Sequence, residues 1–320
     1  MITHAIELEN LDIDAVELAV SPQVLPKLQQ MISDCNTNPD EIRDMIRLEP
    51  ALSAMVLKTA NSAYFNPGYH IDSIDDGIMH LGFSDVYQIC TMLAFTDVLA
   101  KSLPTYGIGA GEFWARSVAC ALAMERLARK YGEDPAIAYT AGLLHGIGMI
   151  FIENEIGSIP NVGLKNQLPE DIAIAKEELQ VFGVDHAKVG ASVMHRWGFS
   201  DDIVVPVRCQ FDPSEAGKHE RMACLMSFAK RMIGTVINEN GEGTSVPGPD
   251  PLLIALLHLS KEEYIRVAEK LRINFNKAKG LVGVIPEGDG KSGQATKEVV
   301  AKNPRLAKDL GYGSRQIREN

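Results

Sequence analysis

The sequence lacks several features that would place it in a specialised class of protein. It contains no run of about 18 uncharged apolar residues, so no transmembrane helix is expected. Its first residues carry no positively charged stretch like the one that opens a secretory signal peptide. The cysteines are widely spaced and form no Cys-x-x-Cys pair: Cys35, Cys90, Cys120, Cys209 and Cys224. We therefore expect a cytoplasmic protein with reduced thiols and no zinc or redox site.

An excess of positive charge is also lacking. The 320 residues include 31 Lys and Arg against 42 Asp and Glu, which gives a formal net charge of −11. Such a chain does not present the broad basic surface that drives binding to nucleic acid. Binding to an anionic membrane surface is disfavoured for the same reason. Neither nucleic acid nor membrane is therefore expected among the partners.

Strand patterns are sparse, whereas helix signals occur along most of the chain. Capping residues stand before apolar, helix-forming stretches, and glycines follow some of these stretches. The expected N-terminal caps are Asn38, Ser73, Asp134, Asp185 and Ser260, and the glycines expected to end helices are Gly132 and Gly198. The fold class predicted from these signals is all-α.

Composition divides the chain into four parts. Residues 1–17 are acidic and form either a short lead-in or a tail that docks on a partner. Residues 18–213 carry the main domain. Residues 214–285 are expected to add helices, with a polar, turn-rich loop at 238–250. From residue 286 to 320 apolar content falls and Gly, Lys and Ser increase, which predicts a disordered, mildly basic tail.

The most informative motif is Ala-Gly-Leu-Leu-His-Gly-Ile-Gly-Met at residues 141–149. It resembles the motif of HD-type phosphohydrolases, in which a His-Asp pair holds a divalent cation. Here His145 is retained, but Gly146 stands at the aspartate position and Met149 at a lysine position. Glycine offers no side-chain ligand. The resemblance therefore implies a relative that has kept the scaffold of these hydrolases and lost their chemistry.

Further blocks resemble the HDOD family, the bacterial "HD-related output domain", in their order and spacing. They lie at residues 25–26, 44–53, 58–63, 73–82, 114–117, 141–148 and 178–190. The motif residues singled out by the resemblance are Asn61, Ser62, Trp114, Ser117, Glu178 and Trp197. Over residues 18–213 it implies an N-terminal helical bundle packed on an HD-like helical bundle, with extra C-terminal helices. It also implies a signalling or regulatory role.

The sequence departs from the family pattern where a metal would be held. Arg116 stands where the family commonly has a histidine, Gly146 replaces the aspartate, and Cys209-Gln210 fall where paired histidines often occur. Among the histidines only His145 and His186 align with motif positions. A fixed positive charge at Arg116 would repel a cation. We therefore expect no metal, no cofactor and no enzymatic activity.

A structural role is the first expectation for most of these residues. We expect His145 to bond a backbone carbonyl, Asp185 to cap a helix, and Arg116 to form an interhelical ion pair. Gly146 and Gly148 are expected in a helix interior, where they would allow close helix approach. Asn61 and Ser62 are expected to cap or turn the chain. The expected core residues are Trp114, Trp197, Leu143 and Leu144.

Three functions follow from the sequence as competing hypotheses. The first is a non-enzymatic signalling module that binds another protein, such as a sensor kinase or a cyclic-dinucleotide enzyme. The second is a sensor that holds a phosphate or nucleotide ligand in a remnant pocket near Arg116, His145, Gly146, Asp185 and His186, without cleaving it. The third, ranked lowest of the three, is a metal-dependent phosphohydrolase with unrecognised ligands.

Overall fold

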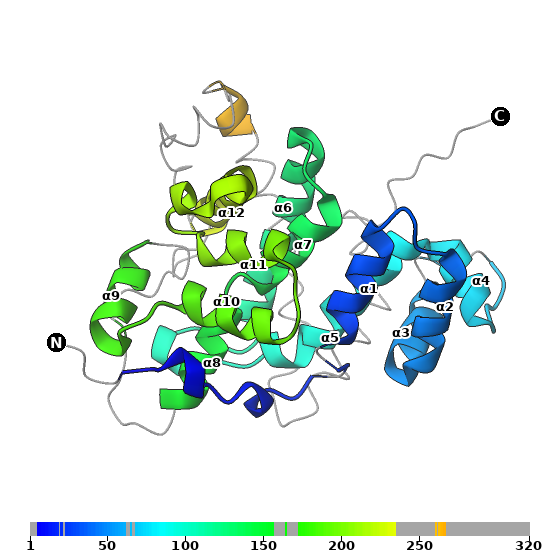
Figure 1. Cartoon of the computed structure of the whole chain (residues 1–320), viewed down its shortest axis with the longest axis horizontal. Coiled ribbons are helices and arrows are strands. Elements are labelled where there is room, and N and C mark those ends of the chain that lie inside the picture. The colour runs from blue at the N-terminus through cyan, green and yellow to red at the C-terminus, as the bar shows by residue number, and fades with distance from the viewer. Residues whose placement is uncertain are drawn as a thin grey trace.

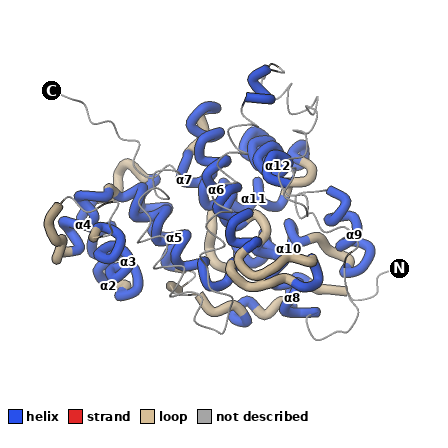
Figure 2. Tube along the Cα trace, turned by 180° about the vertical axis from the view of Figure 1, so that it is seen from behind, coloured by secondary structure: helices blue, strands red, loops and turns tan. Residues whose placement is uncertain are grey.

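The computed structural model describes residues 5–18, 20–21, 23–61, 65, 68–156, 164, 172–234, 260 and 262–266. In these residues the chain is helical and contains no β-strand, apart from one isolated bridge between Leu103 and Ile108 (Figure 2). The all-α prediction is therefore confirmed. The predicted loop at 238–250, the predicted tail at 286–320 and Ser62 lie outside the described residues.

The N-terminal half of the fold is a group of helices at one end of the molecule (Figure 1). Its helices are α1 (Val24–Ser33), α2 (Pro39–Leu48), α3 (Pro50–Ala60), α4 (Ile74–Leu81) and α5 (Phe83–Leu99). The first four pack against one another at the far end, whereas α5 runs inward and contacts α6, α7 and α8. Thirteen of the residues of α5 are buried, so this helix joins the N-terminal group to the rest of the fold.

The second half surrounds the stretch that carries the His145 motif. Its helices are α6 (Glu112–Tyr131), α7 (Pro135–Leu144), α8 (Ile147–Ile156), α9 (Ile172–Phe182), α10 (His186–Arg196), α11 (Asp201–Arg208) and α12 (Glu220–Gly234). Helix α7 packs along α6, and α10 packs against α8 and α11. Helix α12, beyond residue 213, lies on α6 and α11 and continues the helical body.

Helix ends follow the predicted capping chemistry. The side chains of Asn38, Ser73 and Asp134 accept hydrogen bonds from backbone N–H groups in the first turns of α2, α4 and α7. Ser260 and Glu263 form the reciprocal bonds of a capping box, at 3.1 and 3.2 Å. Gly132 ends α6 with a positive φ of 75°. The local sequence therefore determines where these helices start and stop.

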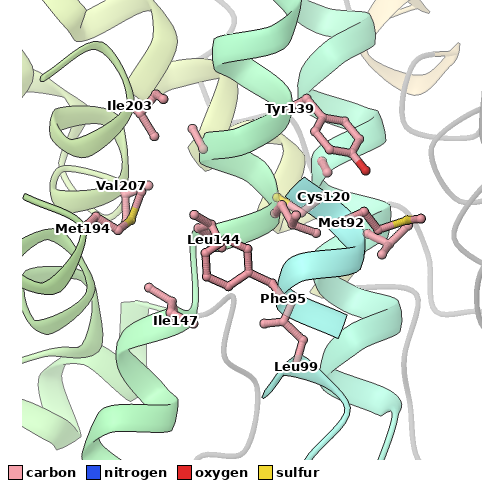
Figure 3. Close-up of a cluster of buried hydrophobic side chains, with 14 of the residues drawn as sticks. Met92, Phe95, Leu99, Cys120, Tyr139, Leu144, Ile147, Met194, Ile203 and Val207 are labelled. Atoms are coloured by element: carbon pink, nitrogen blue, oxygen red, sulfur yellow. The ribbon is translucent and has the colours of Figure 1, made fainter. Parts of the chain in front are cut away.

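The core is built where helices of the two halves meet. Trp197 lies between Phe95 of α5 and Phe151 of α8, with ring centroids 5.8 and 5.9 Å away. Figure 3 shows Leu144 and Phe95 at this junction, among the other buried side chains drawn there. The predicted core positions Trp114, Trp197, Leu143 and Leu144 are all buried to 1% exposure or less. These four predictions are confirmed.

Glycines allow the helices around the motif to approach closely. A Cβ added to Gly148 would lie 2.1 Å from the carbonyl oxygen of His186 and 2.6 Å from the nitrogen of Gly190. A Cβ added to Gly142 would lie 2.8 Å from the backbone of α6. The obstacles are main-chain atoms in both cases, so a side chain at either position would push helices apart. The prediction of close approach at Gly148 is confirmed.

The acidic N-terminal segment lies along the body of the molecule (Figure 1). The N–H of Ile6 donates to the carbonyl of Phe182, at 2.9 Å, and Arg196 donates to the carbonyl of Leu11, at 2.8 Å. Leu11 and Val16 are buried. This segment therefore packs on α9 and α10 of its own chain, as a lead-in to the main domain would.

One apolar segment is long enough to cross a membrane by length and composition alone. It is Pro135–Ile156, which contains α7 and α8, and most of it is buried inside the fold. Burial of this kind is also found for the core helix of a protein that does not span a membrane. Among the described residues no second segment of this kind occurs.

Candidate functional site

His145 occupies the junction between α7 and α8. Its Nδ1 donates to the carbonyl oxygen of Gly142, at 2.7 Å, because a carbonyl can only accept. The predicted bond to a backbone carbonyl is therefore confirmed. The imidazole is 3% exposed. Its pKa is lowered to about 3, mainly by burial and next by the charge of Lys230, with smaller contributions from His186 and Arg116, while the hydrogen bond to Gly142 opposes the shift.

Gly146 lies in the turn after α7 and not inside a helix, which corrects the expected helix-interior position. The chain changes direction here before α8 begins at Ile147. A Cβ at Gly146 would lie 2.8 and 2.9 Å from two ring atoms of Phe113, which is buried on α6. The aromatic ring therefore fills the space that the first atom of an aspartate side chain would need.

His186 is held by a buried carboxylate. Glu178 on α9 is fully buried and accepts from both the N–H and the Nδ1 of His186, at 2.9 Å. It also accepts from the hydroxyl of Tyr106, at 2.8 Å. The Nε2 of His186 is buried and has no partner in the described part of the chain, and the ring meets Phe211 edge to face at 5.2 Å. Glu178 thus orients this imidazole.

Arg116 and Glu112 form an ion pair one helical turn apart on α6. The guanidinium lies 2.8 Å from the carboxylate, and its side chain is 4% exposed. Both residues belong to α6, so this bond is intrahelical, and the interhelical pair expected for Arg116 stays a prediction. The charge of Arg116 nevertheless reaches His145, where it contributes to lowering the pKa.

Gln210 and Lys230 complete the surroundings of His145. The Nε2 of Gln210 donates to the carbonyl of His145, at 2.9 Å, and its Oε1 accepts from the ammonium of Lys230. Lys230 is 1% exposed and lies 4.0 Å from the centroid of the Phe211 ring. The sequence reasoning missed Lys230. The available signal was a lysine that follows the mostly apolar residues 222–229 of α12.

The remaining predicted residues have structural contacts. Asp185 caps α10 by accepting from the N–H of Lys188, at 2.9 Å. Asn61 donates to the carbonyls of Leu57 and Ile71 and accepts from the N–H of Ile71, at 2.7 to 3.0 Å. It ties the end of α3 to the segment before α4. Trp114 and Ser117 are buried on α6.

These contacts define the chemical character of the motif region. It brings together two imidazoles, a buried guanidinium and a buried ammonium, with Glu178 behind one imidazole. In the described residues no group of three or more His, Cys, Asp or Glu side chains is placed to hold a metal ion. A catalytic cation needs about three protein ligands. The guanidinium and the ammonium can donate hydrogen bonds to an anion, whereas the neutral imidazole of His145 already donates through Nδ1 and can only accept at Nε2.

Comparison with known proteins places the chain by fold and by family. The sequence matches the HDOD domain family over residues 18–213. A solved structure named "Putative signal transduction protein", from Marinobacter aquaeolei VT8, superposes with a TM-score of 0.64 at 20% identity, covering 86% of this chain and 63% of that one. An HDOD domain protein with unknown function from Geobacter sulfurreducens gives 0.54 at 20% identity, covering 89% and 94%.

Two further relatives are of similar distance. A structure named "Putative phosphohydrolase", from Shewanella amazonensis SB2B, has a TM-score of 0.57 at 22% identity and covers 94% of this chain and 99% of that one. An uncharacterized protein of Treponema pallidum (strain Nichols) is 21% identical over 257 residues, which is 79% of this chain and 49% of that protein. The chain thus spans about half the length of this relative. The structural likenesses show the fold, whereas the sequence match covers more than half of the chain and shows the family. The chain belongs to the HDOD domain family.

Proposed function

We propose that this chain is a non-catalytic regulatory module that acts by binding another protein. One observation carries the proposal: Gly146 supplies no carboxylate beside His145, and even a Cβ there would lie 2.8 Å from the ring of Phe113. A cation there would lose the anionic ligand that offsets its dehydration.

The electrostatics of the region support the same proposal. Lys230 and Arg116 are both buried, and both lower the pKa of His145. Two fixed positive charges near the imidazoles oppose a divalent cation, most strongly where water is excluded. A member of this family that binds no cation can still bind other proteins through its surface. We therefore assign recognition of another protein to this chain.

Names of structural relatives agree with a regulatory role without deciding the chemistry. One relative is named as a signal transduction protein and another as a phosphohydrolase. Both share the fold, so the fold is compatible with either function. The distinction rests on the side chains of this chain at Gly146, Arg116 and Gln210.

The catalytic half of the proposal is tested with purified full-length chain. Hydrolysis of bis-p-nitrophenyl phosphate is measured with Mn²⁺, Ni²⁺, Fe²⁺ and Mg²⁺, with His145→Ala as the matched control. We expect wild type and control to be indistinguishable from buffer. Turnover that the wild type shows and His145→Ala loses would contradict the proposal.

The recognition half needs a partner that can be reconstituted. The tagged chain is used to capture proteins from the bacterium's own lysate, and each candidate is purified and mixed with the chain. We expect one candidate to form a complex of fixed stoichiometry in size-exclusion chromatography with light scattering. Failure of every candidate to form such a complex counts against the proposal.

A second function, a sensor of a phosphate-bearing ligand, is favoured by a specific observation. The Nε2 of His186 is buried with no partner among the described residues, in a region that also contains the buried cations Arg116 and Lys230. Buried polar atoms usually have a partner, and arginine binds phosphate through its planar fork of donors. Because Nδ1 donates to Glu178, the Nε2 of a neutral imidazole accepts, and the hydroxyl of a hydrogen phosphate group would supply the donor that this nitrogen lacks.

Thermal denaturation distinguishes the sensor from the module that only binds protein. Phosphate, ATP, GTP and a cyclic dinucleotide are each added to wild type and to Arg116→Ala. A sensor gives a melting temperature that rises with ligand concentration in the wild type and stays constant in the variant. Unchanged melting temperatures across the set would remove this second function.

A further inference from the structure

The helices α1 and α2 leave an open groove between them at the far end of the N-terminal half. The groove has a volume of about 570 Å³. From α1 it is lined by Val24, Lys27 and Met31, and from α2 and the residue after it by Glu41, Asp44, Met45, Leu48 and Glu49. The two sets repeat every three or four residues, so each forms one stripe along its helix.

These stripes lie beside the faces that are fully buried. Leu25 and Leu28 of α1 and Ile42 and Ile46 of α2 are buried to 4% exposure or less. Val24, Met31 and Met45 are partly buried and pack against the edge of the core, so they present one side to the fold and the other to the groove. Leu48 is 84% exposed, which is the kind of accessible apolar position that marks binding sites when it belongs to a patch.

The charge at the rim of the groove is mainly negative. Glu41, Asp44 and Glu49 contribute carboxylates, and Lys27 contributes one ammonium. The neighbouring Arg47 is directed to Asp44, at 2.8 Å, and to Asp75 of α4. Arg47 therefore holds α2 to α4 and pairs with Asp44, which leaves Glu41 and Glu49 as the rim carboxylates that face an occupant. An occupant that complements this rim carries positive charge.

The floor suits a helix more than a single small molecule. Two methionines, Met31 and Met45, supply flexible and polarisable contacts that adapt to the partner's side chains. The lining stripes run over eight residues, 24–31, and nine residues, 41–49, which is about 10 to 12 Å of helix and roughly two turns. Helices that lie in grooves present apolar residues at i, i+3, i+4 and i+7, a length and spacing that match this groove.

We propose that the groove between α1 and α2 binds an amphipathic helix of a partner protein, one with an apolar face flanked by Lys and Arg. The proposal deepens the proposed function, on which it rests, by naming the surface and the chemistry of the partner. The apolar face would lie over Val24, Met31, Met45 and Leu48, and the basic residues would meet the carboxylates of the rim.

The chain offers a reporter for this groove. Cys35 is the only exposed cysteine, since Cys90, Cys120, Cys209 and Cys224 are buried. It lies two residues after the end of α1, in the connection to α2. A maleimide fluorophore on Cys35 of the full chain therefore reports on events at the groove without a mutation.

The probe is a synthetic 14-residue helix with leucines at i, i+3, i+4 and i+7 and lysines elsewhere, and its control has glutamates in place of the lysines. We expect saturable binding of the lysine peptide and at least 10-fold weaker binding of the glutamate peptide. Leu48→Asp should weaken binding at least 10-fold, and so should Glu41→Lys combined with Glu49→Lys. Equal binding of both peptides would overturn the proposal.

Matched controls separate the groove from the general acidity of the chain. Met79→Asp changes an equally accessible apolar residue of α4, 76% exposed and outside the groove. Asp201→Lys combined with Glu215→Lys reverses two first-turn carboxylates on α11 and the 3-10 helix Pro213–His219. We expect these variants to bind the lysine peptide as wild type does. A loss in the controls equal to that in the groove variants would overturn the proposal.

Other occupants give different readings in the same assay. A second copy of the chain would change the Cys35 signal with protein concentration in the absence of peptide, and would overturn the proposal. The reconstituted partner of the proposed function gives the final comparison. If this partner binds wild type and Leu48→Asp equally, the groove is not its binding site, while the proposed function stands. If no partner forms a complex, the proposed function fails, whatever the result with the peptide.

Discussion

The two regions that bear on function use their side chains in opposite ways. Around His145, charged and polar groups are buried and bonded to one another, and aromatic rings fill the space between them. Between α1 and α2, partly buried apolar side chains and the exposed Leu48 line an open groove with charges at its rim. The contacts of the first region stabilise the fold, whereas the second region is accessible from the surface. Under the proposed function, the motif region supports the fold and recognition takes place elsewhere on the molecule.

The largest expected effect lies in the packing of the buried region. Gly148→Ala places a methyl group 2.1 Å from a backbone carbonyl of α10, which cannot move without the helix. Overpacking of this kind costs about 3 kcal/mol or more. Gly146→Ala meets only the end of the Phe113 side chain, and should cost about 1 kcal/mol. Urea denaturation of the two variants measures both changes in the free energy of unfolding. Equal losses would show that α8 and α10 can separate enough to accept a methyl group at position 148.

The carboxylate behind His186 should give the next largest effect. Glu178→Gln weakens three hydrogen bonds by removing the charge and places an amide donor among donors. A loss of about 2 to 3 kcal/mol in the free energy of unfolding is expected. Tyr106→Phe removes one of these donors and should cost about 1 kcal/mol. Chemical denaturation measures both losses in the free energy of unfolding. If Glu178→Gln left this free energy unchanged, the charge of Glu178 would not be what organises the buried network.

His145 should make the buried region sensitive to acid. Its pKa is about 3 in the folded chain, below the ordinary value of 6.5, so the unfolded chain takes up the proton first. Stability is therefore lost as pH falls from about 6.5 towards 3. Between pH 7 and 5 this loss is on the order of 1 to 2 kcal/mol, and His145→Gln should lack it. If the free energy of unfolding fell equally with pH in wild type and in His145→Gln at pH 7, 6 and 5, the lowered pKa of His145 would be contradicted.

The smallest effect is expected at the groove. Leu48→Asp changes a side chain that is 84% exposed and should shift the free energy of unfolding by less than about 0.5 kcal/mol. Leu28→Ala on the buried face of α1, 0% exposed, should cost about 2 to 5 kcal/mol. Thermal and urea denaturation test this contrast. A large loss in the free energy of unfolding with Leu48→Asp would mean that Leu48 stabilises the fold.

Local features were predictable because their causes lie within a few residues. Asn38, Asp134 and Asp185 cap the helices that follow them, and Gly132 ends α6, since each uses backbone groups of its own turn. The glycine at position 146, where the motif of HD-type phosphohydrolases has an aspartate, is likewise read from the sequence alone.

Features that depend on distant segments were not predictable. The ring that lies against Gly146 comes from Phe113, and the ammonium near His145 comes from Lys230 on α12. Nothing in the local sequence pairs either residue with the motif. Arg116 shows the reverse case: an interhelical pair was expected, whereas Glu112, one turn away on the same helix, supplies a carboxylate. The groove between α1 and α2 depends on how two helices diverge, which periodicity does not reveal.

The central claim is that the region around His145 has no capacity to anchor a divalent cation. It is tested most directly by equilibrating the purified chain with Mn²⁺, Fe²⁺, Ni²⁺ or Zn²⁺, removing free ions by gel filtration and measuring metal per chain by mass spectrometry. The account predicts much less than one ion per chain, with no difference between wild type and His145→Ala. One tightly held ion per wild-type chain, lost in His145→Ala, would contradict it.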